Sequence, residues 1–427
     1  MRLARRNGQV PRRRSSRTGP GDAHGPDRWL AKGRSSVRND HCTARSAAFS
    51  LAPQADPPTA GRVGKDGRAI NTDAITHPTL PHLGVAARID RALAEFLDDQ
   101  IYRYPNMDWP AVLKVTAAFV LNGGKRLRPQ FCYWGWRGAG GEDDLRIINA
   151  AASLELLHAF ALIHDDIMDA SDTRRGRPTV HRSLARLHQR NGWSGDAERF
   201  GVNTALLCGD LCAFWSDEML HGCGLPAASL AKARPVLNTM RTELCAGQYL
   251  DISEQVAGGT LDGALRVIRY KAARYTVERP LQLGGILAGA GAAVQEGYSA
   301  YGIPIGEAFQ LRDDLLGVFG DPAVTGKSVL DDLRDGKATV LIALARRYAD
   351  AAQLALIESW HGNPALGEDE AAALRETIWR TGAPDRVTEM IGERTEEALA
   401  ALNGLDIDAA AQAALRDLAL RATDRQA

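Results

Sequence analysis

The sequence lacks three features that would narrow its interpretation at once: a cysteine framework, a net charge and a long apolar run. Its six cysteines among 427 residues include no CxxC pair, which favours a reducing, cytoplasmic setting. Lys plus Arg and Asp plus Glu both number 52, so the charge balance gives no argument for a nucleic-acid partner. No apolar run reaches the ~18 residues that a membrane span needs. We therefore expect neither a membrane span nor a nucleic-acid partner.

Two common motif classes are missing as well. Cys208 and Cys212 lie four residues apart, but no further Cys or His nearby completes a tetrahedral zinc site, so we interpret them as small core residues. No segment matches the P-loop pattern G-x-x-x-x-G-K-[ST]. Strand-like alternation bounded by hairpin turns is nearly absent, which argues against a β-rich fold.

The composition changes near residue 80. Residues 1–84 are rich in Arg, Gly, Pro, Ser and Asp and carry no periodic apolar face, which predicts a disordered basic extension. The first 20 residues loosely resemble an organellar transit peptide because they combine many Arg and Ser with no acid. A basic arm for nucleic acid or acidic lipid is another option. We favour a dispensable tail, with the true start of the protein further along the chain.

From residue 85 onward, apolar residues recur at the spacing of three and four that indicates an amphipathic helix, as in Val85, Ile89 and Leu93. The sequence therefore predicts an all-α fold, in which residues 85–427 form one domain. Similar patterns predict further helices after residue 368 and over residues 111–121, 145–171, 203–220, 230–257, 261–274, 280–293, 300–319 and 339–355.

The first chemical signal is the stretch LIHDDIMD at the end of an almost wholly apolar helix. At about 100° per residue, Asp165 and Asp169 lie within about 40° of each other, and Asp166 lies beside them. His158, seven residues before Asp165, falls on nearly the same face. Carboxylates at the C-terminal end of a buried helix oppose its dipole and lose solvation, so a bound cation is expected to compensate them.

A second acidic cluster, Asp313, Asp314 and Asp321 in FQLRDDLLGVFGD, follows another apolar helix that carries Gln310. One such cluster alone would fit a solvated helix end. Two of the same form favour a shared metal site. Oxygen ligands without Cys or clustered His suit Mg²⁺, which usually completes its shell with phosphate oxygens, so we expect a diphosphate between the clusters.

A cationic counterpart follows two glycines in LNGGKRLRPQ, where the backbone permits a close approach to phosphate. Lysine offers a point charge and arginine a bidentate fork for phosphate oxygens. Each cation alone would pass for a surface residue, but the set is what two diphosphates require. Its members are Lys125, Arg126, Arg128, Arg174, Arg175, Lys271, Lys327 and Lys337.

These segments together resemble the trans-isoprenyl diphosphate synthases of the polyprenyl synthetase family. The resemblance extends from about residue 85 to the C-terminus, and it rests on the ordered motifs GGKRLRP, DDIMD, RRG, FQLRDDLLGVFGD, TGK and GKATV. It implies a bundle of the isoprenoid synthase type around a central cavity, usually a homodimer. It also implies a Mg²⁺-dependent prenyltransferase that condenses isopentenyl diphosphate head-to-tail with an allylic diphosphate.

The resemblance also implies roles for single residues. Asp165, Asp169 and Asp313 would ligate three Mg²⁺, with Asp166 and Asp314 supporting them. The residues that would grip the allylic diphosphate or face the reacting centre are Arg174, Lys271, Lys327 and Gln310. Those that would bind isopentenyl diphosphate are Lys125, Arg128, His158 and Arg175. Lys337 would help to close the site.

Two positions depart from the family pattern. Ala272 follows Lys271 where the family usually has Thr or Ser, so one hydroxyl is missing. Gly317 stands where some members carry a third Asp. The metal scheme depends on neither position.

Chain length in this family is limited by the residues four and five before the first aspartate, here Ala161 and Phe160. Each isoprene unit adds about 4 kcal/mol of apolar burial, at roughly 0.8 kcal/mol per methylene, so elongation stops only where a side chain blocks it. One aromatic beside a small residue resembles geranylgeranyl diphosphate synthases. The alternative interpretation is that Phe160 is simply part of the core.

The alternatives of the same class are farnesyl and longer polyprenyl diphosphate synthases. A class I terpene cyclase shares the aspartate-rich helix but lacks the Gly-Gly-Lys element. A non-catalytic subunit of a heteromeric synthase generally loses one acidic cluster, and this chain keeps both. A purely structural helical protein with acidic patches would bind no diphosphate.

Overall fold

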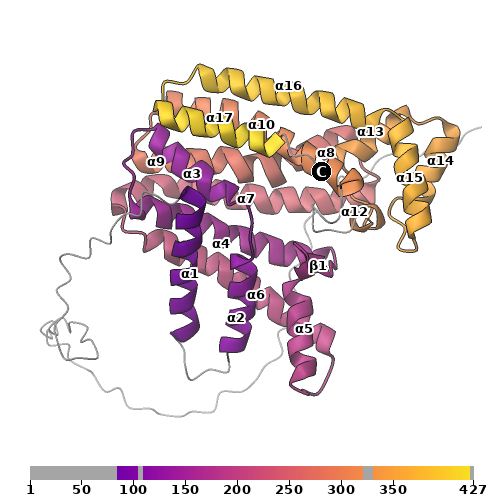
Figure 1. Cartoon of the computed structure of the whole chain (residues 1–427), viewed down its shortest axis with the longest axis horizontal. Helices are drawn as coiled ribbons and strands as arrows, with labels where there is room; N and C mark the ends of the chain where they lie inside the picture. Colours follow the sequence, from indigo (N-terminus) through magenta and orange to yellow (C-terminus); the bar gives the residue numbers. More distant parts are fainter. Residues whose placement is uncertain (1–83, 104–108, 321–329, 424–427) are drawn as a thin grey trace, which may run out of the picture. The chain divides into compact units, whose positions relative to one another are not determined.

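The computed structural model of the chain describes residues 84–103, 109–320 and 330–423, all of which belong to one compact unit. Nearly all of these residues are helical, as the sequence predicts (Figure 1). Residues 1–83 lie outside the described part, so the disordered extension and the boundary at residue 85 stay predictions.

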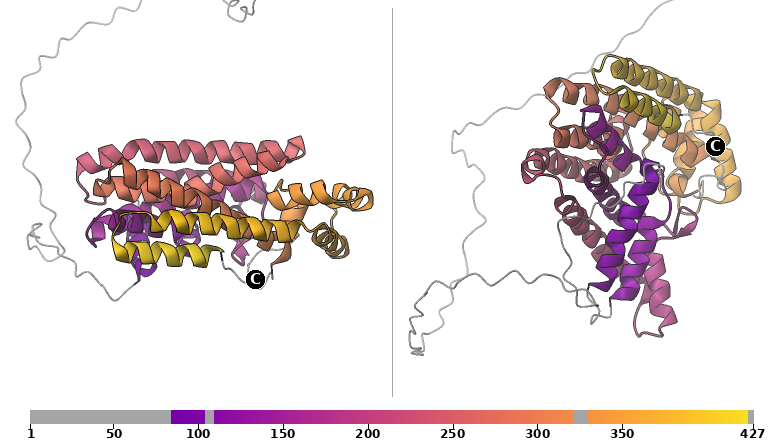
Figure 2. Two further views of the ribbon diagram at one scale, coloured as in Figure 1. Left: turned by 90° about the horizontal axis from the view of Figure 1, so that it is seen from above. Right: turned by 60° about the vertical axis from the view of Figure 1, so that its left-hand side comes forward.

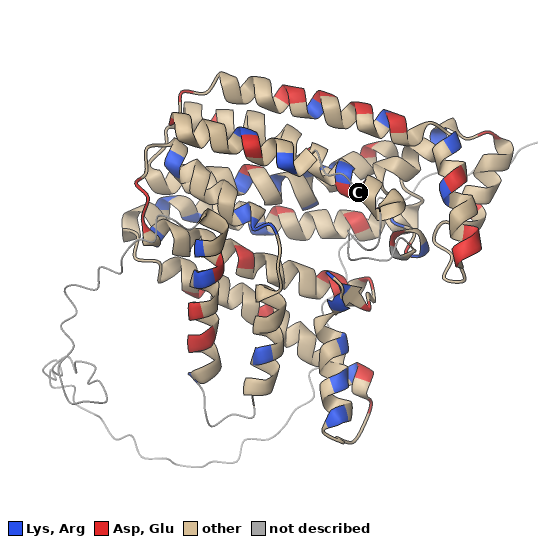
Figure 3. Cartoon of the chain, in the orientation of Figure 1, with Lys and Arg blue, Asp and Glu red and all other residues tan. Residues whose placement is uncertain are grey.

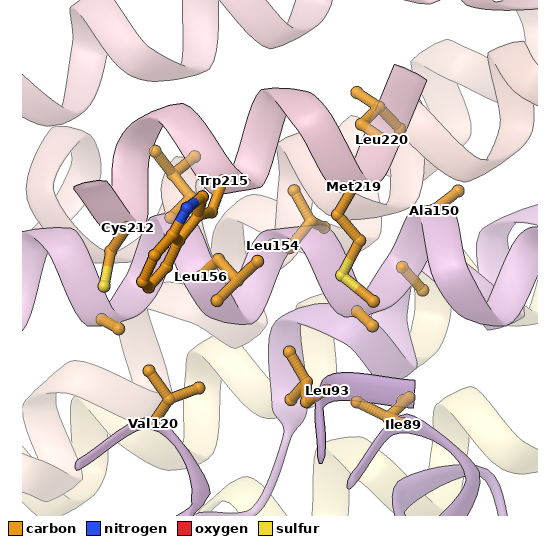
Figure 4. Packing of buried hydrophobic residues seen from close by; sticks show 14 of the residues in the cluster. Ile89, Leu93, Val120, Ala150, Leu154, Leu156, Cys212, Trp215, Met219 and Leu220 are labelled. Atoms are coloured by element: carbon orange, nitrogen blue, oxygen red, sulfur yellow. The ribbon is translucent and has the colours of Figure 1, made fainter. Parts of the chain in front are cut away.

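Helix α4 (Leu145–Met168) occupies the centre of the first core cluster. The Asp144 side chain caps it by accepting a hydrogen bond from the backbone N–H of Arg146. Apolar residues then continue around the whole circumference, so the helix has no solvent-facing stripe. Figure 4 shows Leu154 of α4 with Met219 on one side and Leu93 on the other. A helix packed on all sides holds the aspartates at its end in fixed positions.

The elements packed against α4 come mainly from the first half of the domain. They are α1 (Val85–Tyr102), α2 (Pro110–Leu121), α3 (Leu127–Gly138), α5 (Val180–Arg190), α6 (Ala197–His221) and, from later in the chain, α9 (Arg279–Ala288). Neither α3 nor α5 was predicted, because each is short and interrupted by polar residues.

The second half is built around α10 (Ala292–Phe319), which packs against several later helices (Figure 2). The remaining elements are α7 (Ala227–Ala257), α8 (Leu261–Val267), α12 (Asp331–Arg334), α13 (Val340–Tyr348), α14 (Ala351–Trp360), α15 (Glu368–Arg380), α16 (Ala383–Asn403) and α17 (Ala409–Thr423). The helix predicted over 339–355 is two helices, because the Asp350 side chain caps α14 and starts it anew.

A π-helical segment, η1 (Ile268–Glu278), joins α8 to α9 without a break. The sequence predicted a gap between residues 274 and 280, which the structure contradicts. Hydrogen bonds from i to i+5 stack residues five apart, whereas an α-helix would turn them about 140° from each other. Glycines let two helices approach this segment closely: a Cβ on Gly247 would lie 2.5 Å from the backbone N of Lys271.

One short antiparallel ribbon interrupts the helices, formed by β1 (Thr173–Arg174) and β2 (Arg177–Pro178). Its two turn residues, Arg175 and Gly176, both have positive φ, as the tight two-residue hairpin turn requires. The ribbon directly follows the aspartates of α4, so it directs two consecutive arginines in different directions.

Two expectations about apolar segments can be compared with the fold. By length and composition, α4 is the one described helix that could cross a membrane, yet 67% of its apolar window is buried inside the protein, as in a core helix. Cys208 and Cys212 are fully buried in the core and unpaired, in line with their interpretation as small core residues. The cytoplasmic location stays a prediction.

Candidate active site

The aspartates that end α4 lie beside a buried arginine from the ribbon. Asp166 is fully buried, and its Oδ1 accepts a 2.6 Å hydrogen bond from Arg174 Nε. Arg174 also lies 3.4 Å from Asp165 Oδ2. Asp169, at the C-cap of the helix, donates its backbone N–H to the carbonyl of Asp165. The helix end therefore fixes three carboxylates next to one guanidinium.

Lys271 of the π-helical segment ties α4 to α7. Its Nζ lies 3.1 Å from Asp165 Oδ1 and 2.6 Å from Asp251 Oδ2. Burial would raise the pKa of Asp165, but Lys271, Lys337 and Arg174 together lower it to about 2. Asp165 is therefore ionised across the physiological pH range, as a metal ligand must be.

Lys337 makes the matching connection on the other side. Its Nζ lies 3.1 Å from Asp169 Oδ2 and 3.4 Å from Asp332 Oδ1. The Asp332 carboxylate lies over α10 at Gly317, where an added Cβ would come within 2.1 Å of its Oδ2. The glycine that stands in place of a third aspartate therefore leaves room for a carboxylate that comes from α12.

The second acidic cluster, on α10, faces the same region. Gln310 Nε2 donates a 2.9 Å hydrogen bond to Asp314 Oδ1. Burial raises the pKa of Asp314 to about 7, in spite of that bond, and the charges of Asp313, Asp332 and Asp251 add to the rise. Because Asp251 also pairs with Lys271, the acidic ends of α4 and α10 belong to one electrostatic unit, which we call the carboxylate cage. Its members are Asp165, Asp166, Asp169, Asp251, Asp313, Asp314 and Asp332.

The cage has fewer positive charges than negative ones among the described residues. Arg174, Lys271 and Lys337 are the cations paired with it, so carboxylates are in excess. No group of three or more His, Cys, Asp or Glu in the described ranges converges closely enough to enclose an ion alone. Mg²⁺ fits such a set, because it takes few carboxylates and fills its shell with water and substrate phosphate oxygens.

A second group of predicted residues gathers around Tyr275 and Thr276 of the same π-helical segment. Arg128 lies 4.3 Å from the ring of Tyr275 and donates a 2.8 Å hydrogen bond to Thr276 Oγ1. The His158 ring is 6.2 Å from the ring of Tyr275. Burial, and then the charges of Arg128 and Arg175, lower the pKa of His158 well below its usual value. A neutral imidazole therefore lies among arginines, in surroundings suited to an anion.

The π-helical turn accounts for the arrangement of these two groups. Lys271 and Thr276 are five residues apart, so i-to-i+5 hydrogen bonding stacks them on one face. Lys271 contacts the carboxylate cage, whereas Thr276 contacts Arg128. A regular α-helix would carry one of them away from the site.

The Gly-Gly-Lys loop is held by a buried arginine, Arg126. Its Nε lies 2.6 Å from Asp90 and its Nη1 lies 2.7 Å from Glu155 of α4, and its side chain is only 1% exposed. It adopts φ 49°, which is unusual for a residue with a side chain. Lys125 precedes it at the exposed tip of the loop. Arg126 therefore anchors the loop, whereas Lys125 and Arg128 present cations.

Arg175 bridges the ribbon and that loop. Its Nη1 donates to the carbonyls of Asn122 and Gly123 at 3.0 and 2.9 Å. A Cβ on Gly124 would lie 3.2 Å from the guanidinium, so the glycine lets the arginine lie flat against the loop. Arg175 also lines a narrow gap with His158 and Leu162.

Phe160 and Ala161 are half-buried on α4, in contact with the first core cluster. The Phe160 ring packs edge-on against His164, with ring centroids 4.9 Å apart. His164 in turn packs over Gly209 of α6. Phe160 therefore packs on the side chain that contacts α6, and its effect on chain length stays a prediction.

Sequence reasoning missed two members of the cage, Asp251 and Asp332. Asp251 is a single acid on a helix with other polar residues, and Asp332 belongs to the short charged run LDDLRD, so both resemble solvated positions. One signal in the sequence could have pointed to Asp251. Gly247 precedes it by one helical turn in GQYLD, and a glycine within a helix can mark close packing against a neighbouring segment. Lys327 and Asp321 lie outside the described residues.

Comparison with known proteins adds an independent result. The sequence profile of the polyprenyl synthetase family matches residues 110–378. The (2E,6E)-farnesyl diphosphate synthase of Mycobacterium tuberculosis is 32% identical over 368 residues, which cover 84% of this chain and 96% of that protein. The geranylfarnesyl diphosphate synthase of Aeropyrum pernix is 34% identical over 268 residues, which cover 62% of this chain and 78% of that protein.

A solved structure is similar over most of its length. Geranylgeranyl pyrophosphate synthase from Corynebacterium glutamicum, complexed with isoprenyl diphosphate and magnesium, has a TM-score of 0.77 and 42% identity. The match covers 80% of this chain and 99% of that one.

The buried pair of Arg126 and Glu155 gives a prediction about stability. Glu155→Gln leaves the Arg126 charge buried with only Asp90 as its partner, so we expect the free energy of unfolding to fall by about 3 kcal/mol. Urea denaturation measures it. The matched control Glu218→Gln removes an acid from an exposed pair with Arg103 and should cost less than about 1 kcal/mol. Equal losses in the two variants would refute the anchoring role of Arg126.

Proposed function

The chain belongs to the polyprenyl synthetase family and is a prenyl diphosphate synthase, and on this premise we propose that it makes geranylgeranyl diphosphate with three Mg²⁺ in each active site. The substrates are isopentenyl diphosphate and an allylic diphosphate. The observation that carries the proposal is the carboxylate cage. In it Lys271 links the end of α4 to Asp251, and Lys337 links it to Asp332. The charges of Asp251 and Asp332 in turn act on Asp314 of α10.

Asp165, Asp169 and Asp313 are the proposed metal ligands. Asp166 supports them through Arg174, and Asp314 through Gln310. When bound, the Mg²⁺ ions supply positive charge to the diphosphate that leaves as the allylic carbon becomes cationic. Enzymes of the family depend on a metal ion, and the excess of carboxylates supports the same dependence here.

The cations paired with the carboxylate cage form the proposed binding site for the allylic diphosphate. In the ligand-free arrangement Lys271 and Lys337 are paired with carboxylates that would turn to metal. Once released from those pairs, they stabilise the charge of the departing diphosphate without reorganising solvent. The residues proposed to grip the allylic diphosphate are Arg174, Lys271 and Lys327, with Gln310 facing the reacting centre and Lys337 closing the site.

The second group binds isopentenyl diphosphate in this proposal. Its members are Lys125, Arg128, His158 and Arg175. His158 contributes a neutral hydrogen-bonding group, because burial and then the arginines around it keep its pKa low. No side chain here need act as a strong base, since the released diphosphate can accept the proton lost after condensation. The apolar side chains of α4 exclude water that would quench the cation.

The test of the function is a product assay. Purified protein is incubated with labelled isopentenyl diphosphate, separate allylic starters and Mg²⁺, and the dephosphorylated alcohols are separated by chromatography. We expect a C20 alcohol, and at least a 100-fold loss of turnover in Asp165→Asn, equivalent to ~2.7 kcal/mol of transition-state stabilisation. Asp262→Asn, an exposed change on α8, should leave turnover unchanged. Release of a hydrocarbon would favour a cyclase instead, and a product other than C20 would correct the assigned length.

Phe160 is the residue that we propose to limit the chain length of the product. It is the aromatic residue five positions before Asp165, and Ala161 beside it leaves space. We expect Phe160→Ala to lengthen the main product by at least one isoprene unit, because each added unit gains apolar burial once the block is removed. Chromatography of the alcohols measures it. Phe96→Ala on α1 removes the same ring elsewhere, and an identical product spectrum in both variants would contradict the assignment.

We also propose that the chain forms a homodimer through α6. Leu207 and Phe214 lie two turns apart on that helix, and they are 51% and 68% exposed. Pairing with α6 of a second copy would remove this apolar surface from water. Light scattering should give twice the chain mass, and Phe214→Glu should give the single mass. Tyr102→Glu, at the exposed end of α1, should stay dimeric; a monomeric wild type would refute the proposal.

A further inference from the structure

A cavity of about 330 Å³ lies beside Arg174 and Arg175, between α2, the ribbon and α5. Its volume is at the low end of the range for small-molecule sites, about 300–1,000 Å³. Five of the residues that line it are arginines: Arg174, Arg175, Arg177, Arg186 and Arg190. None of the described residues that line it is acidic. Figure 3 shows Lys and Arg along α5, which borders the cavity.

This cavity is distinct from the two diphosphate positions described above. Lys125, Arg128 and His158, the other proposed contacts of isopentenyl diphosphate, do not line it. Neither does Lys271 or Lys337 of the cage. Arg174 and Arg175 form the common wall, and they already donate hydrogen bonds to Asp166 and to the loop carbonyls, respectively. A ligand in the cavity would therefore rely mainly on other arginines.

Those other arginines lack counter-ions within the described part of the chain. Neither Arg186 nor Arg190 pairs with a carboxylate there, and both are exposed on α5. They are four residues apart on one helix face, a spacing at which like charges destabilise a helix. In contrast, Arg182 on the same helix pairs with Asp172 and Glu198. The unpaired arginines are thus the ones that border the cavity.

The rest of the wall suggests which anion fits. Val115, Ala118 and Phe119 of α2 and Val180 of α5 form an apolar surface opposite the arginines. Planar guanidinium forks match phosphate oxygens in bidentate fashion, and several converging forks suit a polyanion better than a single carboxylate. An anion with an apolar portion would contact both surfaces.

We propose that this cavity is a second diphosphate-binding site, separate from the catalytic one. It binds the diphosphate group of either the prenyl diphosphate product or the inorganic diphosphate that the reaction releases. The site is independent of the metal ions, because its ligands are arginines alone. Its occupant would lie against Arg175, through which it adjoins the catalytic site.

The test uses the whole chain with its catalytic site filled by Mg²⁺, isopentenyl diphosphate and an unreactive thio analogue of the allylic diphosphate. Calorimetric titration with inorganic diphosphate, and separately with geranylgeranyl diphosphate, should reveal one further binding event per chain. Arg186→Gln/Arg190→Gln removes two charge-assisted donors, so the affinity should fall at least tenfold. Tighter binding of the prenyl compound would identify the product as the occupant, and equal binding would identify the diphosphate ion.

The matched control, Arg234→Gln/Arg375→Gln, removes two charges from α7 and α15, away from the cavity, and should bind as the wild type does. No uptake beyond the filled catalytic site, or equal affinity in both double variants, would overturn the proposal. Turnover is measured in parallel. Because Arg186 and Arg190 take no part in the proposed catalysis, the variant should keep its turnover, and an inactive wild type would count against the catalytic proposal instead.

Discussion

The cost of burying carboxylates at the ends of apolar helices governs this structure. An isolated buried carboxylate is far less stable than one in water, so each acid here needs a cation or must take up a proton. Asp165 remains ionised because three cationic side chains surround it, whereas burial and three neighbouring carboxylates raise the pKa of Asp314 to about 7. In the described part of the chain, the site therefore holds more carboxylates than the cations paired with them.

The backbone is adapted to that requirement at particular positions. The π-helical segment lets Lys271 reach the cage while Thr276, one wide turn later, reaches Arg128. Gly247 lets α7 approach closely enough for Asp251 to share Lys271. Gly317 leaves the space that Asp332 fills. Each of these features is a local departure from regular helix packing, and each brings a charged group into place.

The sequence predicted most of the helices and the paired acidic clusters because both follow from periodicity and spacing alone. It also predicted His158, Arg128 and Lys271 through the family resemblance, and the structure brings these residues to the same region. Asp251 and Asp332 escaped notice, since a lone acid or a short charged run has the same pattern whether it is solvated or buried. The π-helical turn was missed for a related reason: its wider hydrogen bonding leaves no mark in apolar spacing, and the sequence predicted a break instead.

The π-helical segment η1 limits which insertions and deletions related sequences can carry. In a regular helix, the loss of one residue rotates everything beyond it by about 100°, and neighbouring loops can often absorb the change. Within η1 both flanking helices are continuous with the segment, so no loop lies nearby. Related chains can therefore exchange side chains at many of these positions, but an insertion or deletion between Lys271 and Thr276 would turn one end of the catalytic chamber away from the other.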